Sequence, residues 1–111
     1  MNTTTLTTQN YANQIGYSDV SPFEIVRRVS EKVIEIRPMT AERDKTVKLD
    51  FQVGGFMAHC SNQDDQKWTI TSDPAAEVRR IRLHKDGWWR DSGRNRYRLA
   101  AEPRRFYDFN F

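Results

Sequence analysis

The chain has one cysteine, Cys60, and two histidines among its 111 residues. A single cysteine cannot form an internal disulfide, which is typical of proteins from a reducing compartment. No apolar run approaches the roughly 20 residues of a membrane-spanning helix, so the sequence predicts no membrane segment. The N-terminus lacks a basic region followed by an apolar stretch, and we therefore expect no signal peptide.

The scarcity of histidine and cysteine also argues against metal-dependent chemistry. A structural zinc site needs four ligands, whereas the chain has only His59, Cys60 and His84 of these types. In a strand, the adjacent side chains of His59 and Cys60 point to opposite faces and cannot act as a base and its nucleophile. Gly54-Gly55 lacks the lysine of a phosphate-binding loop. The sequence therefore predicts no metal, no cofactor and no enzymatic activity.

Basic residues are concentrated in the last third of the chain. Residues 1–75 hold eight basic and ten acidic residues, whereas residues 76–111 hold ten basic and five acidic ones, a local net charge of +5. A local excess of this kind indicates a binding face for an anionic partner. The sequence pI of about 9.2 argues against an acidic mimic of nucleic acid.

Turn residues divide the sequence into short segments rich in β-formers. Segments 23–29 and 33–37 predict a β-hairpin, and the polar segment 40–50 predicts a helical turn or a loop. Residues 51–59 predict one strand with a bulge at its glycine pair. We expect further strands over residues 67–71, 80–84, 88–90, 94–99 and 106–111. This pattern, without an amphipathic helix of about ten residues, favours an all-β fold, either a small antiparallel barrel or a sandwich.

The two ends of the chain differ in character. The first 14 residues are rich in threonine and asparagine and carry no charged side chain, so we predict a flexible leader over residues 1–15 and a single β domain over residues 16–111. At the other end, Tyr107, Phe109 and Phe111 form a stripe with a period of two. We expect this stripe to pack in the core, so that truncation there unfolds the domain.

Arginines alternate with apolar residues in the predicted strands 80–84 and 94–99. If the apolar residues face the core, the arginines lie on the outer surface, where two paired strands would form one basic face. Arginine binds phosphate or carboxylate bidentately, and the more exposed of two adjacent tryptophans could stack a base or anchor a protein. The candidate binding residues are Arg80, Arg82, Trp88, Trp89, Arg90, Arg94, Arg96 and Arg98.

A purely structural role explains the same arginines equally well. Their stems can cover aromatic neighbours while their charged heads pair with nearby carboxylates. The available carboxylates are Glu77, Asp86, Asp91 and Glu102. The sequence leaves both interpretations open.

Several motifs of this chain are distinctive as a set. They are Gly16-Tyr17-Ser18-Asp19, the segments 33–37 and 68–70, the turn 82–88 and the ending 106–111. Together they resemble a family of small proteins from bacteriophages and other mobile elements, and the resemblance covers roughly residues 16–111. It implies a compact SH3-like β-barrel in a protein of the bacterial cytoplasm, and it implies no catalytic residue.

Small phage proteins without enzymatic activity often antagonise host defences, anti-CRISPR proteins included. The resemblance therefore leads us to expect an inhibitor that binds a host defence protein or ribonucleoprotein complex stoichiometrically through the arginine face. Two alternatives remain: a nucleic-acid-binding β-barrel, whose affinity would fall steeply with salt, and a structural or assembly component of the virion, which would self-associate symmetrically. The oligomeric state stays open.

Overall fold

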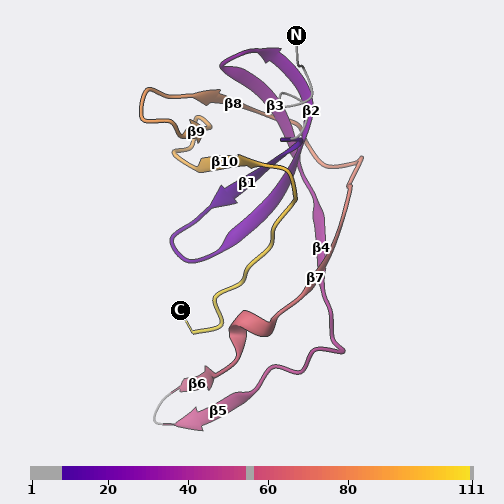
Figure 1. The fold of residues 1–111 in the computed structure, drawn as a ribbon, viewed down its shortest axis with the longest axis vertical. Coiled ribbons are helices and arrows are strands. Elements are labelled where there is room, and N and C mark those ends of the chain that lie inside the picture. Colours follow the sequence, from indigo (N-terminus) through magenta and orange to yellow (C-terminus); the bar gives the residue numbers. More distant parts are fainter. Residues whose placement is uncertain (1–8, 55–56, 111) are drawn as a thin grey trace.

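Six strands form a closed antiparallel barrel (Figure 1). The computed structural model describes residues 9–54 and 57–110, and the strand order around the barrel is β1-β10-β9-β8-β3-β2. An all-β fold with a small antiparallel barrel is therefore confirmed, with 48% of the residues in strands. The barrel strands are β1 (Tyr11–Ile15), β2 (Val20–Ser30), β3 (Val33–Pro38), β8 (Arg79–Leu83), β9 (Trp89–Arg90) and β10 (Arg96–Ala100).

The core of the barrel is formed by inward-facing residues of these strands. Phe23 and Tyr97 meet edge to face, with 5.3 Å between their ring centroids. The β2–β3 hairpin and the inward positions of Ile81 and Tyr97 agree with the period-two pattern of the sequence. The buried cluster comprises Ala12, Phe23, Ile34, Ile36, Ile81, Trp89 and Tyr97.

Strand β1 lies within the segment that the sequence assigned to a flexible leader. It pairs with β2 on one edge and with β10 on the other, so this prediction is wrong for residues 11–15, and residues 1–8 lie outside the described residues. Ala12 faces the core, whereas the side chain of Asn13 is buried on the opposite face. The Asn13 amide donates to the carbonyl of Glu102 at 3.1 Å and accepts from the N–H of Arg104 at 2.9 Å. Because these partners lie far along the chain, no local pattern predicts a strand here.

Between β3 and β8 the chain leaves the barrel as an arm, residues 39–78, so the molecule measures 55 × 29 × 28 Å (Figure 1). The arm contains two separate two-stranded sheets. They consist of β4 (Thr40–Arg43) with β7 (Trp68–Thr71), and of β5 (Phe51–Gly54) with β6 (Met57–Cys60), after which comes the short 3-10 helix η1 (Gln63–Asp65).

The arm confirms one sequence prediction and corrects two. The strand expected over residues 67–71 is present as β7. At residues 40–43 its partner β4 replaces the helical turn or loop expected over residues 40–50, whereas residues 44–50 form a turn and loop as expected. Such an exposed ladder needs no apolar alternation, which is why its sequence pattern indicates no strand. The single strand expected over residues 51–59 is a hairpin of β5 and β6, and its Gly55 lies outside the described residues.

The C-terminal residues do not form the predicted closing strand. Among residues 106–110, only Phe106 pairs with the barrel, through an isolated bridge to Val20. The expected core stripe is also wrong, because Tyr107 is 44% exposed and Phe109 packs on Phe51 of the arm rather than in the barrel. Phe111, the third residue of that stripe, lies outside the described residues.

Amide side chains attach this C-terminal segment to the arm. The Gln66 side chain accepts from the N–H of Tyr107 and donates to its carbonyl, each at 2.9 Å. In the same way, the Asn110 side chain accepts from the N–H of Cys60 at 2.7 Å and donates to its carbonyl at 2.8 Å. These two amides replace the backbone partners that a strand would supply.

Removal of residues 106–111 is expected to loosen the arm and leave the barrel folded, because every residue of the buried cluster precedes Ala100. Amides of the arm segment 60–68 should exchange at least about tenfold faster than in the full chain, while those of β2 and β3 stay protected. Amide hydrogen exchange and thermal unfolding of the two chains provide the measurement. Loss of cooperative unfolding on truncation would instead place this segment in the core.

Candidate binding face

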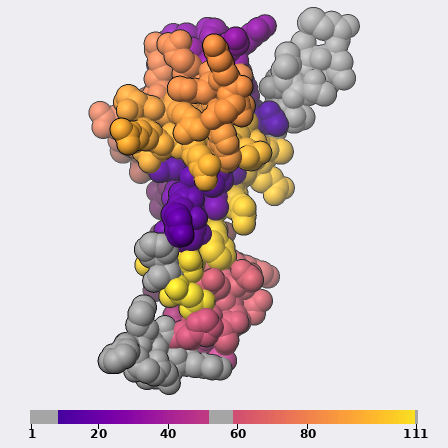
Figure 2. Space-filling view, turned by 90° about the vertical axis from the view of Figure 1, so that its left-hand side faces the viewer, coloured from indigo at the N-terminus to yellow at the C-terminus, as the bar shows by residue number. Residues whose placement is uncertain are grey.

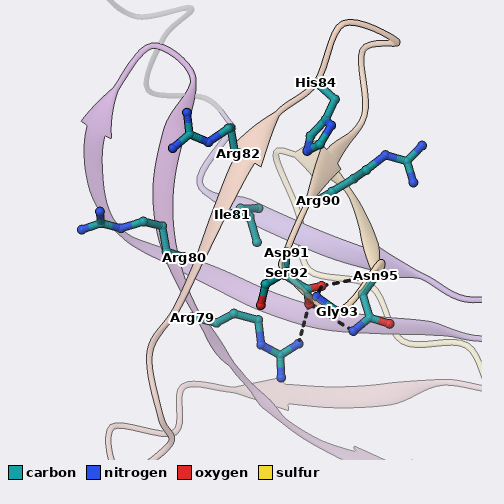
Figure 3. A pocket seen from close by; sticks show the side chains of 10 residues that line it. All are labelled: Arg79, Arg80, Ile81, Arg82, His84, Arg90, Asp91, Ser92, Gly93 and Asn95. Carbon is teal, nitrogen blue, oxygen red and sulfur yellow. Dashed lines mark hydrogen bonds and ion pairs between the residues drawn. The ribbon is translucent and has the colours of Figure 1, made fainter.

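Strands β8, β9 and β10 carry the candidate arginines on the outside of the barrel. Arg82 lies opposite Arg90, and Arg90 lies opposite Arg96, so three arginines form a row across the three strands. A direct pairing of β8 with β10, which would form one basic face, does not occur, because β9 lies between them. Figure 2 shows this region, in orange, over the upper part of one face of the molecule. The guanidinium groups of Arg82 and Arg90 point away from each other, so the row spreads its charge (Figure 3).

The two adjacent tryptophans face opposite ways. Trp89 lies opposite Leu83 and Tyr97, which both face inward, and is only 8% exposed. Trp89 is therefore a core residue, and its prediction as a binding residue is wrong. Trp88 is half-buried on the outer side, where the guanidinium carbons of Arg96 and Arg98 lie 4.5 and 4.3 Å from its ring centroid. This cation–π arrangement fixes one aromatic ring among positive charges.

Two arginines of the face form ion pairs. Arg80 lies 3.0 Å from a Glu35 carboxylate oxygen, and Arg90 lies 2.7 Å from one of Asp86. Hydrogen bonds from Arg90 and from the backbone N–H of Trp88 lower the pKa of the Asp86 carboxyl, which keeps this pair charged. The structural interpretation of the sequence is thus correct for the pairing of Arg90 with Asp86, and it is also correct for Arg96 and Arg98, which cover the aromatic ring of Trp88. Exposed ion pairs of this kind contribute little to the stability of the fold, so their arginines can readily bind the acidic groups of a partner instead.

The remaining arginines of the candidate set keep their charge unmatched. A guanidinium without a carboxylate partner retains its five N–H donors for a ligand or water. Within the described part of the chain, no ion pair involves Arg82, Arg94, Arg96 or Arg98.

A carboxylate network shapes the loop beside this face. The sequence indicates Asp91 as a partner for arginine but does not indicate its contacts with Tyr97 and with the backbone of the loop. One Asp91 oxygen accepts from the N–H groups of Gly93 (2.8 Å) and Asn95 (3.1 Å). The other accepts from the Tyr97 hydroxyl at 2.8 Å and pairs with Arg79 at 3.4 Å. Burial acts to raise the pKa of Asp91, but hydrogen bonds from Asn95, Tyr97 and Gly93 outweigh it and lower this pKa. The Asp91-Ser92-Gly93 turn was the local signal for part of this network.

The Asp91 loop presents one more basic side chain. Arg94 has a φ of 71°, in the left-handed region that non-glycine residues rarely adopt. The hydrogen bonds of Asp91 to the residues on either side of Arg94 maintain this conformation. Arg94 is therefore exposed on a fixed loop, beside the row of arginines rather than within it.

An open cleft of about 780 Å³ lies between β8 and this loop (Figure 3). Ile81 lies at the base of the cleft but is buried, with 1% of its surface exposed, and Asp91 is the one carboxylate among the lining residues. Asp91 already accepts four hydrogen bonds within its loop and from Tyr97, and it forms an ion pair with Arg79. Its carboxylate is therefore occupied, and positive charge dominates the cleft. Its basic lining residues are Arg79, Arg80, Arg82, His84 and Arg90.

Comparison of the chain with protein-family models, with curated proteins and with solved structures found no match. The arrangement of side chains is therefore the guide to function. In residues 9–54 and 57–110 no three histidine, cysteine or acidic side chains lie together as metal ligands would, and no helix is long and apolar enough to cross a membrane. Cys60 is buried, and its thiol lies 3.7 Å from the Asn62 side-chain oxygen, away from the basic face. What the face offers chemically is the binding of anionic groups beside one aromatic ring.

Proposed function

We propose that the protein is a non-enzymatic, phage-type inhibitor of a host defence system in the bacterial cytoplasm. It acts by stoichiometric binding of a defence protein or ribonucleoprotein complex to the basic face of β8–β10. The observation that supports this most is a set of four arginines without carboxylate partners on or beside β8–β10, two of which, Arg96 and Arg98, lie over the half-buried ring of Trp88. The resemblance to small phage proteins supplies the anti-defence role, including the anti-CRISPR possibility.

The composition of the face suits a protein partner. Tryptophan and arginine are the side chains that most often dominate the energy of protein–protein interfaces. Trp88 is anchored by Arg96 and Arg98 in the free protein, so little side-chain entropy is lost when a partner covers it. Arginines that spread outward can reach several acidic groups of a broad surface, and they also speed association with an acidic partner.

One observation favours nucleic acid as a second candidate. The ring of Trp88 lies close to the guanidinium groups of Arg96 and Arg98, and aromatic rings in a positively charged groove are what stack the bases of single-stranded nucleic acid. In a complex of that kind, binding releases counterions from the nucleic acid. Because this release favours binding less at higher salt, the affinity would fall steeply as the salt concentration rises. The experiment below separates the two candidates.

The double variant Arg96→Ala/Arg98→Ala is expected to weaken partner binding at least about tenfold, because two charged contacts and the support of Trp88 are lost together. The tagged protein captures its partner from host lysate with and without nuclease, and titration with the recovered partner gives the affinity. The matched control is Arg27→Ala/Arg28→Ala on β2, which removes the same charge from another part of the barrel. Equal weakening by both variants would contradict a specific face.

Nuclease treatment decides between the two kinds of partner. A protein that is still captured after nuclease supports the inhibitor, and inhibition of its activity at a one-to-one ratio then tests the anti-defence role directly. Loss of all captured material after nuclease would replace the inhibitor with the nucleic-acid-binding function. The free energy of unfolding of both double variants should differ from that of the unmodified protein by no more than about 0.5–1 kcal/mol, because the substituted side chains are exposed. Denaturant unfolding gives these values.

A further inference from the structure

The barrel wall has an opening where β8 extends beyond β9. β8 has five residues and β9 has two, and the two strands pair only at Arg82–Arg90 and Leu83–Trp89. β9 ends at Arg90 and the chain then enters a turn at residues 92 and 93, so β9 offers no further residue to pair with β8. Among the described residues, no strand therefore pairs with the edge of β8 from Arg79 to Ile81 that faces away from β3.

The orientation of the backbone shows which groups this edge exposes. The N–H of Leu83 donates to the carbonyl of Lys32, on the side of β3, and the N–H of His84 donates to Trp88, on the side of β9. Backbone groups alternate in direction along a strand, so those of Arg82 and Arg80 also point to the side of β9. Arg82 pairs there with Arg90, whereas the N–H and carbonyl of Arg80 point into the cleft.

The cleft beside this edge has the size and the chemistry to accept a polypeptide. Its volume of about 780 Å³ lies within the roughly 300–1,000 Å³ of ligand sites. Figure 3 shows β8 along one wall and the Asp91–Asn95 loop along the other, with Ile81 between them. An added strand would place one set of its alternate side chains on the outer face of the barrel, on the same face as Arg80 and Arg82, and this suits acidic residues at those positions.

We infer that the cleft binds an extended acidic peptide segment of a partner protein, which adds as a strand to the Arg79–Ile81 edge of β8. This inference rests on the proposed function in taking the partner to be a protein, and it specifies how that partner is recognised. In strand addition, backbone hydrogen bonds supply affinity and alternate side chains supply specificity. A second copy of this chain is the poorer occupant, because its own β8 edge would bring the same arginines against the cleft.

The test uses a fluorescent seven-residue peptide of alternating glutamate and valine, with titration by anisotropy. A strand presents only one set of its alternate amides to β8, so two further peptides carry N-methyl groups on either the glutamates or the valines. One methylated peptide should bind at least about tenfold more weakly than the parent and the other about as well, because N-methylation of the set that faces β8 removes the N–H that donates to the carbonyl of Arg80. A peptide with lysine in place of glutamate tests the charge and should not bind.

Amide exchange locates the added strand without altering the protein. With saturating parent peptide, exchange of the Arg80 amide should slow at least about tenfold, while the Arg82 amide, already paired with Arg90, should change little. Equal binding of the two methylated peptides, an unchanged Arg80 amide, or absence of peptide binding would each overturn the inference. Displacement of the peptide by a single-stranded oligothymidine, together with equal binding of the methylated peptides, would assign the cleft to nucleic acid.

These peptide measurements use no host component, so they can fail independently of the proposed function. Peptide binding at Arg80 without capture of a host protein would support strand addition and count against the defence role. Capture that depends on Arg96 and Arg98, with no peptide binding at Arg80, would support the basic face and overturn strand addition.

Discussion

Replacing Tyr97 with alanine is expected to lower the free energy of unfolding by about 3–5 kcal/mol. The side chain is fully buried, and its ring packs edge to face against Phe23 with 5.3 Å between centroids. The hydroxyl accepts from Arg79 at 2.6 Å and donates to Asp91 at 2.8 Å. Alanine would open a cavity in the centre of the barrel. It would also remove the hydroxyl that Arg79 and Asp91 use as their hydrogen-bond partner. Since domains are typically stable by about 5–15 kcal/mol, this change removes a large part of the total.

Tyr97→Phe is the matched control, because it keeps the ring and removes only the hydroxyl. Burial raises the pKa of Tyr97 to about 12, so the hydroxyl is protonated at neutral pH and can donate to Asp91. Loss of hydrogen bonds to these charged partners should cost about 1.5–3 kcal/mol, less than the loss of the whole side chain. Urea unfolding followed by circular dichroism gives both values. Equal destabilisation by phenylalanine and alanine would show that the ring contributes nothing.

The parts of the fold that follow a period of two could be predicted from the sequence. Residues 80–83 and 96–99 alternate charged and apolar side chains, and the buried positions of Ile81 and Tyr97 follow from this alternation. The same rule assigns the arginines to the outer surface. Whether Trp88 or Trp89 faces outward depends on the pairing of β9 with both neighbours, and only the structure shows it.

Other parts depend on contacts between residues far apart in the chain, which leave no local pattern. The burial of Asn13 in β1 depends on Glu102 and Arg104, and the C-terminal segment is positioned by the amides of Gln66 and Asn110. The amides of Asn13, Gln66 and Asn110 bond to backbone groups that lie far away in the sequence. The local composition around each segment therefore does not show whether it forms a strand or what it pairs with. Sequence reasoning therefore predicted the arginine face better than it predicted the two ends of the barrel domain.

The basic cleft also depends on a feature that composition does not show. Its opening exists because β9 is shorter than β8, and its far wall exists because Asp91 fixes the loop. The turn Asp91-Ser92-Gly93 could be predicted, but its connection to the core through Tyr97 could not. Stability of the loop and shape of the cleft are therefore linked through one carboxylate.

Replacing Asp91 with alanine is expected to lower the free energy of unfolding at neutral pH by about 3 kcal/mol. The change leaves the Tyr97 hydroxyl without its acceptor, and it removes the carboxylate that pairs with Arg79. The N–H groups of Gly93 and Asn95 lose their acceptor as well, so the loop should exchange faster and peptide binding in the cleft should weaken. Urea unfolding and amide exchange of residues 93–95 are the measurements.

Asp91→Asn separates the charge of this side chain from its hydrogen bonds. The amide oxygen can still accept from Gly93 and Asn95, so this variant should be less destabilised than Asp91→Ala. The hydrogen bonds lower the pKa of Asp91 in the folded protein, whereas the unfolded chain titrates near an ordinary value of about 3.9. The carboxylate therefore contributes its full stabilisation above that value, and the contribution is lost as the pH falls through the folded-state pKa. The difference in unfolding free energy between the unmodified protein and Asp91→Asn should accordingly be constant from pH 7 to about pH 5 and should shrink below about pH 4. A difference that stays constant down to pH 3 would show that the Asp91 charge does not stabilise the loop.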